Sequence, residues 1–188
     1  MHRRTLGEAH ERLRKDRAAL AEDLLRAPGI LLSIPFLRHL GVESVRYAPG
    51  VAMLRLVLAP HLENSFGMVH GGVSMTLLDV GMAMAARSLI NTALDVSAAS
   101  ENYGVVTVEM KASFLAPGTG ILLARGHCLQ IGAQLIFCEA ELFGAEGALV
   151  AKASGTFKPV RRRAIDHSTD SSAASRNPHE SENHPPGD

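Results

Sequence analysis

The longest apolar segment of the chain, Val73 to Ile90, constrains the fold more than any other feature. Only Asp79 and Arg87 interrupt it with a charge, and its pattern is typical of a helix. A helix that is apolar on every face has to be covered all round. Because no hydrophobic flank precedes the segment, we predict a buried core helix and not a membrane span.

Strand patterns lie on both sides of this helix. Two short runs precede it, 42–47 and 51–58, joined by the turn Ala48-Pro49-Gly50. Four strands are expected after it. The first runs from about 103 to the break at Pro117-Gly118, and the others lie at 121–130, 135–143 and 149–157. An antiparallel sheet curled around the helix would cover it, so the sequence predicts an α+β fold with one long central helix.

The first of the four later strands alternates between apolar and polar residues. This period of two predicts one apolar and one polar face. The apolar face is expected to hold Val106, Val108, Met110, Ala112 and Phe114, and the polar face Thr107, Glu109, Lys111 and Ser113.

Both ends of the chain differ from the central domain, which we place at 41–159. Residues 1–40 read as a helical extension, with an amphipathic helix at 5–26 and a short helix at 34–40. Acids and bases are interleaved along the first helix, so we expect it to pack on the domain or on a partner subunit. Residues 160–188 have almost no apolar content and are predicted to be disordered.

The composition limits the classes of partner and the compartment. Nineteen basic and nineteen acidic residues cancel, which favours neither nucleic acid nor an anionic membrane surface as a partner. The N-terminus has no signal-peptide hydrophobic region, so we expect a cytoplasmic protein. Cys128 and Cys138, the only cysteines, are expected to be reduced thiols on consecutive strands, where they could be cross-strand neighbours.

Chemistry is indicated where the long helix begins. Two glycines, Gly71 and Gly72, allow a ligand to approach backbone N–H groups, which attract negative charge at a helix start. Asp79 is the only acidic residue of the apolar run, and a carboxylate among leucines and methionines is costly without a partner or a task. Together they suggest a site that stabilises an oxyanion at one end and handles a water at the other.

The segment 64–72 reads N-x-x-G-x-x-H-G-G, and an Asp follows nine residues after the His. This pattern resembles the signature of hotdog-fold acyl-CoA thioesterases of the phenylacetyl-CoA (PaaI) type. The resemblance extends from about Leu40 to Pro159 and includes the strand at 106–117. It implies the hotdog fold, hydrolysis of an acyl-CoA thioester, and no metal or cofactor.

The resemblance also suggests roles for individual residues. Gly71, with Gly72, would donate backbone N–H groups to the oxyanion, and Asn64 would orient the carbonyl or the water. His70 would hydrogen-bond to the loop or to the thioester. Thr107 matches the strand position at which the family often places a Ser or Thr that helps to hold the water.

Asp79 is the expected base that activates water, or a direct nucleophile that forms an anhydride. The sequence does not separate these routes, and among its helical neighbours only Thr76 offers a hydroxyl. The nine residues from His70 to Asp79 correspond to about 13.5 Å of helix rise, too far for one small reaction centre. Two antiparallel copies of the helix could join the halves across a two-fold axis, so we expect a homodimer or homotetramer.

Two alternatives of different classes stay open. Hotdog domains also serve as non-catalytic acyl-CoA binding modules, and others are acyl-thioester dehydratases that pair a catalytic His with an acidic residue. Signatures of other chemistry are missing, because the chain has no G-x-S-x-G elbow, no zinc-type ligand spacing and no phosphate-binding glycine motif.

Overall fold

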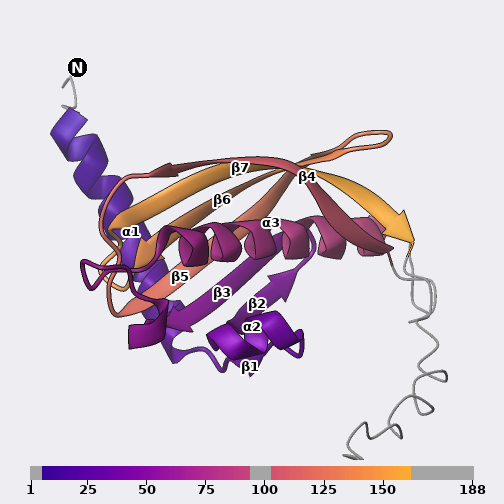
Figure 1. The fold of residues 1–188 in the computed structure, drawn as a ribbon. Helices are drawn as coiled ribbons and strands as arrows, with labels where there is room; N and C mark the ends of the chain where they lie inside the picture. The colour runs from indigo at the N-terminus through magenta and orange to yellow at the C-terminus, as the bar shows by residue number, and fades with distance from the viewer. Residues whose placement is uncertain (1–5, 94–102, 162–188) are drawn as a thin grey trace, which may run out of the picture.

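The long apolar helix, α3 (Gly71–Ala93), lies across one face of a seven-stranded antiparallel sheet (Figure 1). This computed structural model describes residues 6–93 and 103–161. The sheet order is β1-β2-β3-β5-β6-β7-β4. The strands are β1 (Ile30–Leu31), β2 (Glu43–Ala48), β3 (Val51–Val57), β4 (Tyr103–Phe114), β5 (Ile121–Ile131), β6 (Ile136–Gly144) and β7 (Leu149–Arg161). The predicted sheet with one long central helix is confirmed.

Two of the remaining helices match the sequence pattern, and the 3-10 turn lies in a segment that was expected to be a loop. The three elements are α1 (Leu6–Arg26), α2 (Pro35–Leu40) and the short 3-10 turn, η1 (Pro60–Leu62). The two-residue strand β1 was not predicted, since two residues carry no periodicity. β7 ends at Arg161, four residues beyond its expected end, and includes Pro159. Beyond Phe157, β7 pairs only with β4, so Pro159 lies where β7 is an edge strand on its other side, a position at which proline is tolerated. The tail from 162 lies outside the described residues.

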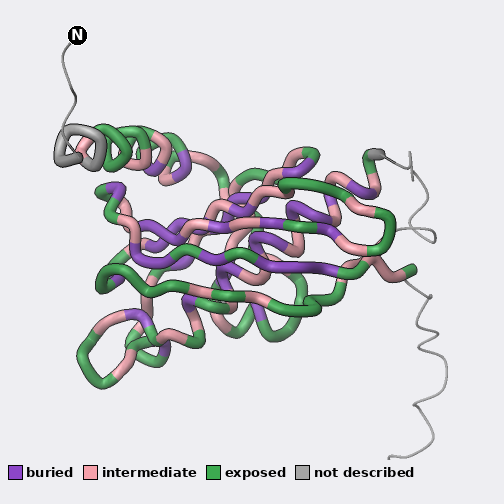
Figure 2. The backbone as a smooth tube through the Cα atoms, turned by 90° about the horizontal axis from the view of Figure 1, so that it is seen from above, coloured by how far each residue is buried: buried purple, intermediate pink, exposed green. Residues whose placement is uncertain are grey.

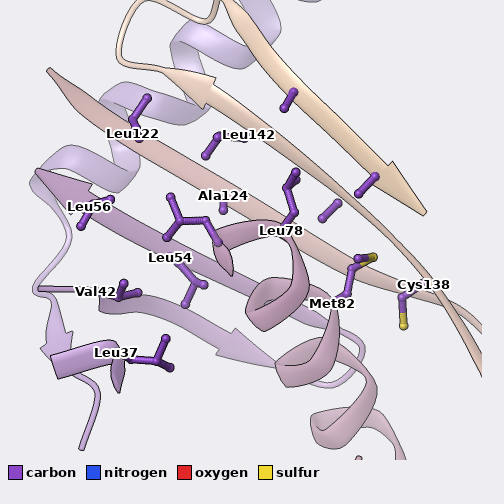
Figure 3. Packing of buried hydrophobic residues seen from close by; sticks show 14 of the residues in the cluster. Leu37, Val42, Leu54, Leu56, Leu78, Met82, Leu122, Ala124, Cys138 and Leu142 are labelled. Atoms are coloured by element: carbon purple, nitrogen blue, oxygen red, sulfur yellow. The ribbon is translucent and has the colours of Figure 1, made fainter. Parts of the chain in front are cut away.

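Leucines of the sheet and the sheet-facing side of α3 form the main core (Figure 3). Leu78 and Met82 of the helix meet Leu54, Leu122 and Leu142 of three neighbouring strands. A side chain at Gly126 of β5 would collide with the backbone of Gly81, so the helix and this strand are in backbone contact. Because Gly126 has no side chain, α3 can lie directly against β5 at this point.

The expectation that α3 would be covered on every face is wrong for the single chain. The sheet covers one side, whereas Thr76, Ala83 and Arg87 on the other side are only half-buried, and Met75 is 40% exposed. Buried positions concentrate in the middle of the molecule (Figure 2). Gly71–Thr92 is long and apolar enough to cross a membrane, yet half of its most apolar window is buried inside the fold, as in a core helix.

The N-terminal helix α1 packs on the opposite face of the sheet from α3 (Figure 1). Ala21 and Leu24 of α1 join a second cluster with Met53, Leu123 and Phe143 of the sheet. The predicted packing of this helix on the domain is thereby confirmed.

Charged residues of the sheet tie α1 in place. Arg55 of β3 donates to the carbonyls of Leu24, Leu25 and Ala27 at 3.2, 3.1 and 3.1 Å, which satisfies carbonyls at the C-terminal end of α1. Its Nε is held 2.7 Å from a carboxylate oxygen of Glu43.

Glu141 makes a second tie, because its carboxylate accepts hydrogen bonds from both Arg17 of α1 and Arg125 of β5, each at 3.1 Å. Burial alone would raise the pKa of Glu141. The hydrogen bond from Arg17 and the charges of Arg17, Arg125 and Lys152 outweigh burial and lower that pKa below its usual value.

The two cysteines are direct cross-strand partners, as the sequence suggested. Cys128 of β5 lies opposite Cys138 of β6, and both are free thiols. Burial raises the pKa of both thiols, which keeps them protonated and unreactive at neutral pH.

Replacement of Arg55 tests how much its contacts with the end of α1 stabilise the fold. We expect Arg55→Ala to lower the free energy of unfolding by about 2–4 kcal/mol, because it leaves Glu43 and three carbonyls without their donor. Arg46→Ala removes another tie to α1, the exposed Arg46–Asp23 pair, and should cost only about 0–1 kcal/mol. Equal losses in urea titrations would contradict this account.

Candidate functional site

His70 caps the start of α3. Its ring Nδ1 accepts the N–H of Gly72 at 3.0 Å, and its carbonyl accepts the N–H groups of Val73 and Ser74 at 3.0 and 3.1 Å. Since Nδ1 is an acceptor, the neutral ring carries its proton on Nε2. The imidazole therefore acts as a side-chain cap of the helix.

This cap separates the roles of the two glycines. The N–H of Gly72, expected to help bind substrate, is already engaged by His70. The N–H of Gly71 has no acceptor among residues 6–93 and 103–161 and points out of the first turn of the helix. Of the two predicted donors, Gly71 is the one that is free to bind a ligand.

Asn64 organises the loop that leads to the helix. Its side-chain oxygen accepts the N–H groups of Phe66 and Met68 at 2.9 and 3.2 Å. The loop also turns at Gly67, whose φ of 70° favours glycine. The side-chain oxygen of Asn64 already accepts two hydrogen bonds within the loop. If Asn64 contacts a substrate carbonyl as expected, it would therefore do so through its amide nitrogen, which is a donor.

Asp79 and Thr107 form a direct pair. The Thr107 hydroxyl donates to Oδ1 of Asp79 at 2.8 Å, joining the middle of α3 to β4. Thr76, the hydroxyl expected near Asp79, instead donates to the carbonyl of Gly72 at 2.9 Å. The structure thus joins two predicted site residues that are 28 positions apart in the sequence.

A β-bulge aims Thr107 at the helix. Thr107 pairs with Phe157, whereas Glu109 pairs with Thr156, so the register shifts around Val108. The predicted strict alternation is therefore wrong at this point. Thr107 lies on the helix side of the sheet together with Met110, and bulges commonly re-aim side chains in this way.

The site residues fall into two groups within one chain. Gly71 and Asp79 belong to the same continuous helix and are about 12 Å apart along its axis. Asn64, His70 and Gly71 lie together at the helix start, and Asp79 and Thr107 form the second group. As the spacing predicted, a single chain does not bring the two groups to one point.

A pocket of about 430 Å³ opens beside Gly71. The ring of Phe114, at the end of β4, lies 3.7 Å from the position that a Cβ of Gly71 would take. The pocket is lined by Asn64, Met68, Val69, Gly71, Ser74, Phe114, Ala116, Pro117, Gly118 and Val150. Sequence reasoning placed Phe114 only on an apolar strand face, and no local signal marked it or Met68 as part of a site.

The pair Asp79–Thr107 lies beside the free edge of the sheet. β4 has a single neighbour in the sheet, β7, so its other edge is unpaired among residues 6–93 and 103–161. Apolar side chains near this edge are exposed, among them Val108 (56%) and Phe114 (55%). An unpaired edge with exposed apolar residues is a surface on which another strand can pair.

Among residues 6–93 and 103–161, no group of three His, Cys, Asp or Glu side chains could hold a metal ion.

Loss of the His70 ring should weaken the helix start. We expect His70→Ala to lower the free energy of unfolding by about 1 kcal/mol, the usual cost of a lost cap. His70→Asn, whose short side chain is a favoured cap, should retain most of that stability. If thermal unfolding is the same in all three proteins, the ring is not a cap.

Comparison with known proteins places this fold and site in a family. The model of the thioesterase superfamily matches residues 66–151. A Halobacterium salinarum protein whose name proposes an esterase is 30% identical over 155 residues, covering 78% of this chain and 94% of the relative. The structure of a conserved Pseudomonas aeruginosa protein is also 30% identical, covers 69% of this chain and 96% of its own, and has a TM-score of 0.60.

A Streptococcus mutans protein, solved with bound acetyl-CoA, shares the fold at 22% identity and a TM-score of 0.55, with 65% of this chain and 90% of its own covered. The range matched by the family model includes His70, Gly71, Asp79 and Thr107, whereas Asn64 lies just before it. The chain belongs to the thioesterase superfamily and has its hotdog fold.

Proposed function

We propose that the chain is a cytoplasmic acyl-CoA thioesterase of the phenylacetyl-CoA type, which hydrolyses a thioester to a free acid and CoA. The observation that carries this proposal is the Asp79–Thr107 hydrogen bond beside the open edge of β4. One carboxylate oxygen is held by the hydroxyl, so the other is left to accept a proton from water. A binding module would not need such a carboxylate.

The second requirement of hydrolysis is a donor for the tetrahedral oxyanion. The unpaired N–H of Gly71 supplies it, supported by the partial positive charge at the start of α3. One such donor contributes about 2.7–4 kcal/mol in the transition state. The water oxygen bonds to the carbonyl carbon, the C–S bond breaks, and CoA leaves as the thiol after taking up a proton.

Asp79 can act in either of two ways. As a base it removes a proton from the attacking water; as a nucleophile it forms an anhydride that water then opens. The hydrogen bond from Thr107 fixes the carboxylate without protonating it, which suits both routes. Single-turnover hydrolysis in oxygen-18 water detects the nucleophilic route when water opens the anhydride at the Asp79 carbonyl, because the label then enters the Asp79 carboxylate and not the product acid.

We infer that the complete site forms between two copies of the chain. Thr107 marks the Asp79 end of β4 and Phe114 marks the Gly71 end. If two β4 edges pair antiparallel about a two-fold axis near Met110, Asp79 of one copy faces Gly71 of the other. Such a homodimer, or a homotetramer of two such pairs, would also cover the exposed apolar residues of the edge. An active monomer would contradict this assembly.

The apolar pocket beside Gly71 suits the acyl group. Met68, Phe114 and Val150 contribute apolar surface, and flexible Met side chains adapt to different shapes. The Streptococcus mutans protein, which shares this fold, was solved with acetyl-CoA bound. We therefore place the acyl group in this pocket and the CoA portion across the subunit interface.

Thiol release from a panel of acyl-CoAs tests the function. The panel should include short, medium and long chains together with phenylacetyl- and benzoyl-CoA. We expect turnover of at least one member, and Asp79→Asn should abolish turnover while substrate affinity is retained. Absence of turnover on every member would favour the non-catalytic binding module, and altered unsaturation without thiol release would favour a dehydratase.

A matched pair of variants tests the oxyanion donor. Gly71→Pro deletes the N–H at the first helical position, where proline is tolerated, and should reduce kcat by about 100- to 1000-fold. Gly71→Ala keeps the N–H, and its Cβ would meet Phe114 at an ordinary contact distance of 3.7 Å. Equal loss of kcat in both variants would show that the pocket shape, and not the N–H, matters.

A further inference from the structure

A second hollow lies on the opposite face of the sheet from the candidate catalytic residues. Its volume is about 530 Å³, within the range of small-molecule sites. It is lined by Arg46, Ala48, Val51, Met53, Arg125 and His127. Met53 packs with Leu24 of α1, whereas its neighbour Leu54 packs with α3, so the hollow opens on the α1 side of the sheet.

The lining combines an apolar floor with a basic rim. Ala48, Val51 and Met53 come from two adjacent strands and present only apolar side chains. Arg46 and Arg125 stand on strands to either side of β3, and each is paired in register with Met53. A few polar groups around an apolar surface are the usual composition of a small-molecule site.

Carboxylates near the rim do not fully balance its charge. Glu141 serves two guanidinium groups, those of Arg17 and Arg125. Glu139 pairs with Lys152 at 2.9 Å, and Asp23 pairs with Arg46 at 3.3 Å. Four cations, Arg17, Arg46, Arg125 and Lys152, therefore face three carboxylates, Asp23, Glu139 and Glu141, which leaves one positive charge in excess.

The Arg46–Asp23 pair can be exchanged for a ligand. Its side chains are 52% and 65% exposed, so water screens their attraction and the pair stabilises the fold little. An anion that also covers the half-buried Ala48 and Val51 with an apolar body can displace Asp23 from the guanidinium. Arginine binds carboxylates with two parallel hydrogen bonds, which favours this group.

We propose that this hollow binds an amphipathic carboxylate, of the class of a fatty acid, with its head between Arg46 and Arg125 and its chain on the apolar floor. The single excess charge matches a monoanion, and the floor matches a chain without polar groups. The site is separated from Asp79 and Gly71 by the sheet, and the inference does not rest on the proposed hydrolysis.

Calorimetric titration of the full-length protein with decanoate tests the proposal. We expect measurable binding of decanoate and none of decanol, which lacks the charge. Arg46→Gln should weaken decanoate binding about tenfold through loss of a charge-assisted hydrogen bond, and Arg125→Met by a similar factor. Arg38→Gln, an exposed arginine on α2, changes the net charge equally and should leave the affinity unchanged.

Asp23→Asn provides a test with the opposite sign. It removes the carboxylate that competes for Arg46, so decanoate should bind about two- to fivefold more tightly. A carboxylate bound instead in the pocket beside Gly71 would respond to neither Asp23→Asn nor Arg46→Gln. That result, or no binding of decanoate to the parent protein, would overturn the proposal. Arg46 and Asp23 form an exposed pair, so both variants should fold.

Discussion

The contact between α3 and the sheet determines where every candidate catalytic group lies. Because Gly126 has no side chain, β5 reaches the helix backbone at Gly81, and the helix is held against the strands. One side of α3 is buried in this way, and Asp79 is left at the flank that faces β4. The same contact leaves apolar residues of the helix such as Met75 exposed, because a single sheet does not cover them, and a second copy could pack on this surface.

Local irregularities then convert this scaffold into a candidate site. The bulge at Val108 turns Thr107 toward Asp79, and the His70 ring engages the N–H of Gly72 while leaving that of Gly71 unpaired. Both devices hold a polar group in place on a rigid element, which is what preorganised catalysis requires. Because the two groups are separated along α3, the proposed hydrolysis would need two copies of the chain.

Much of this arrangement could be predicted from the sequence. The apolar run, the turn residues and the strand patterns located the long helix and six of the seven strands, because periodicity and glycine or proline breaks are local signals. The bulge in β4 is not local: it depends on pairing with β7, so strict alternation placed Thr107 on the wrong face. The two hollows likewise join residues from several strands, and neither Phe114 nor Arg46 carried any signal of its own.

Mixing two inactive variants tests the shared site most directly. Asp79→Asn and Gly71→Pro damage different halves, so a heterodimer of the two has one doubly changed site and one intact site. After random exchange of subunits, half of the dimers are heterodimers, and about one quarter of the parental thioesterase activity should return. A mixture that stays as inactive as its components would contradict a site built from Asp79 of one copy and Gly71 of the other.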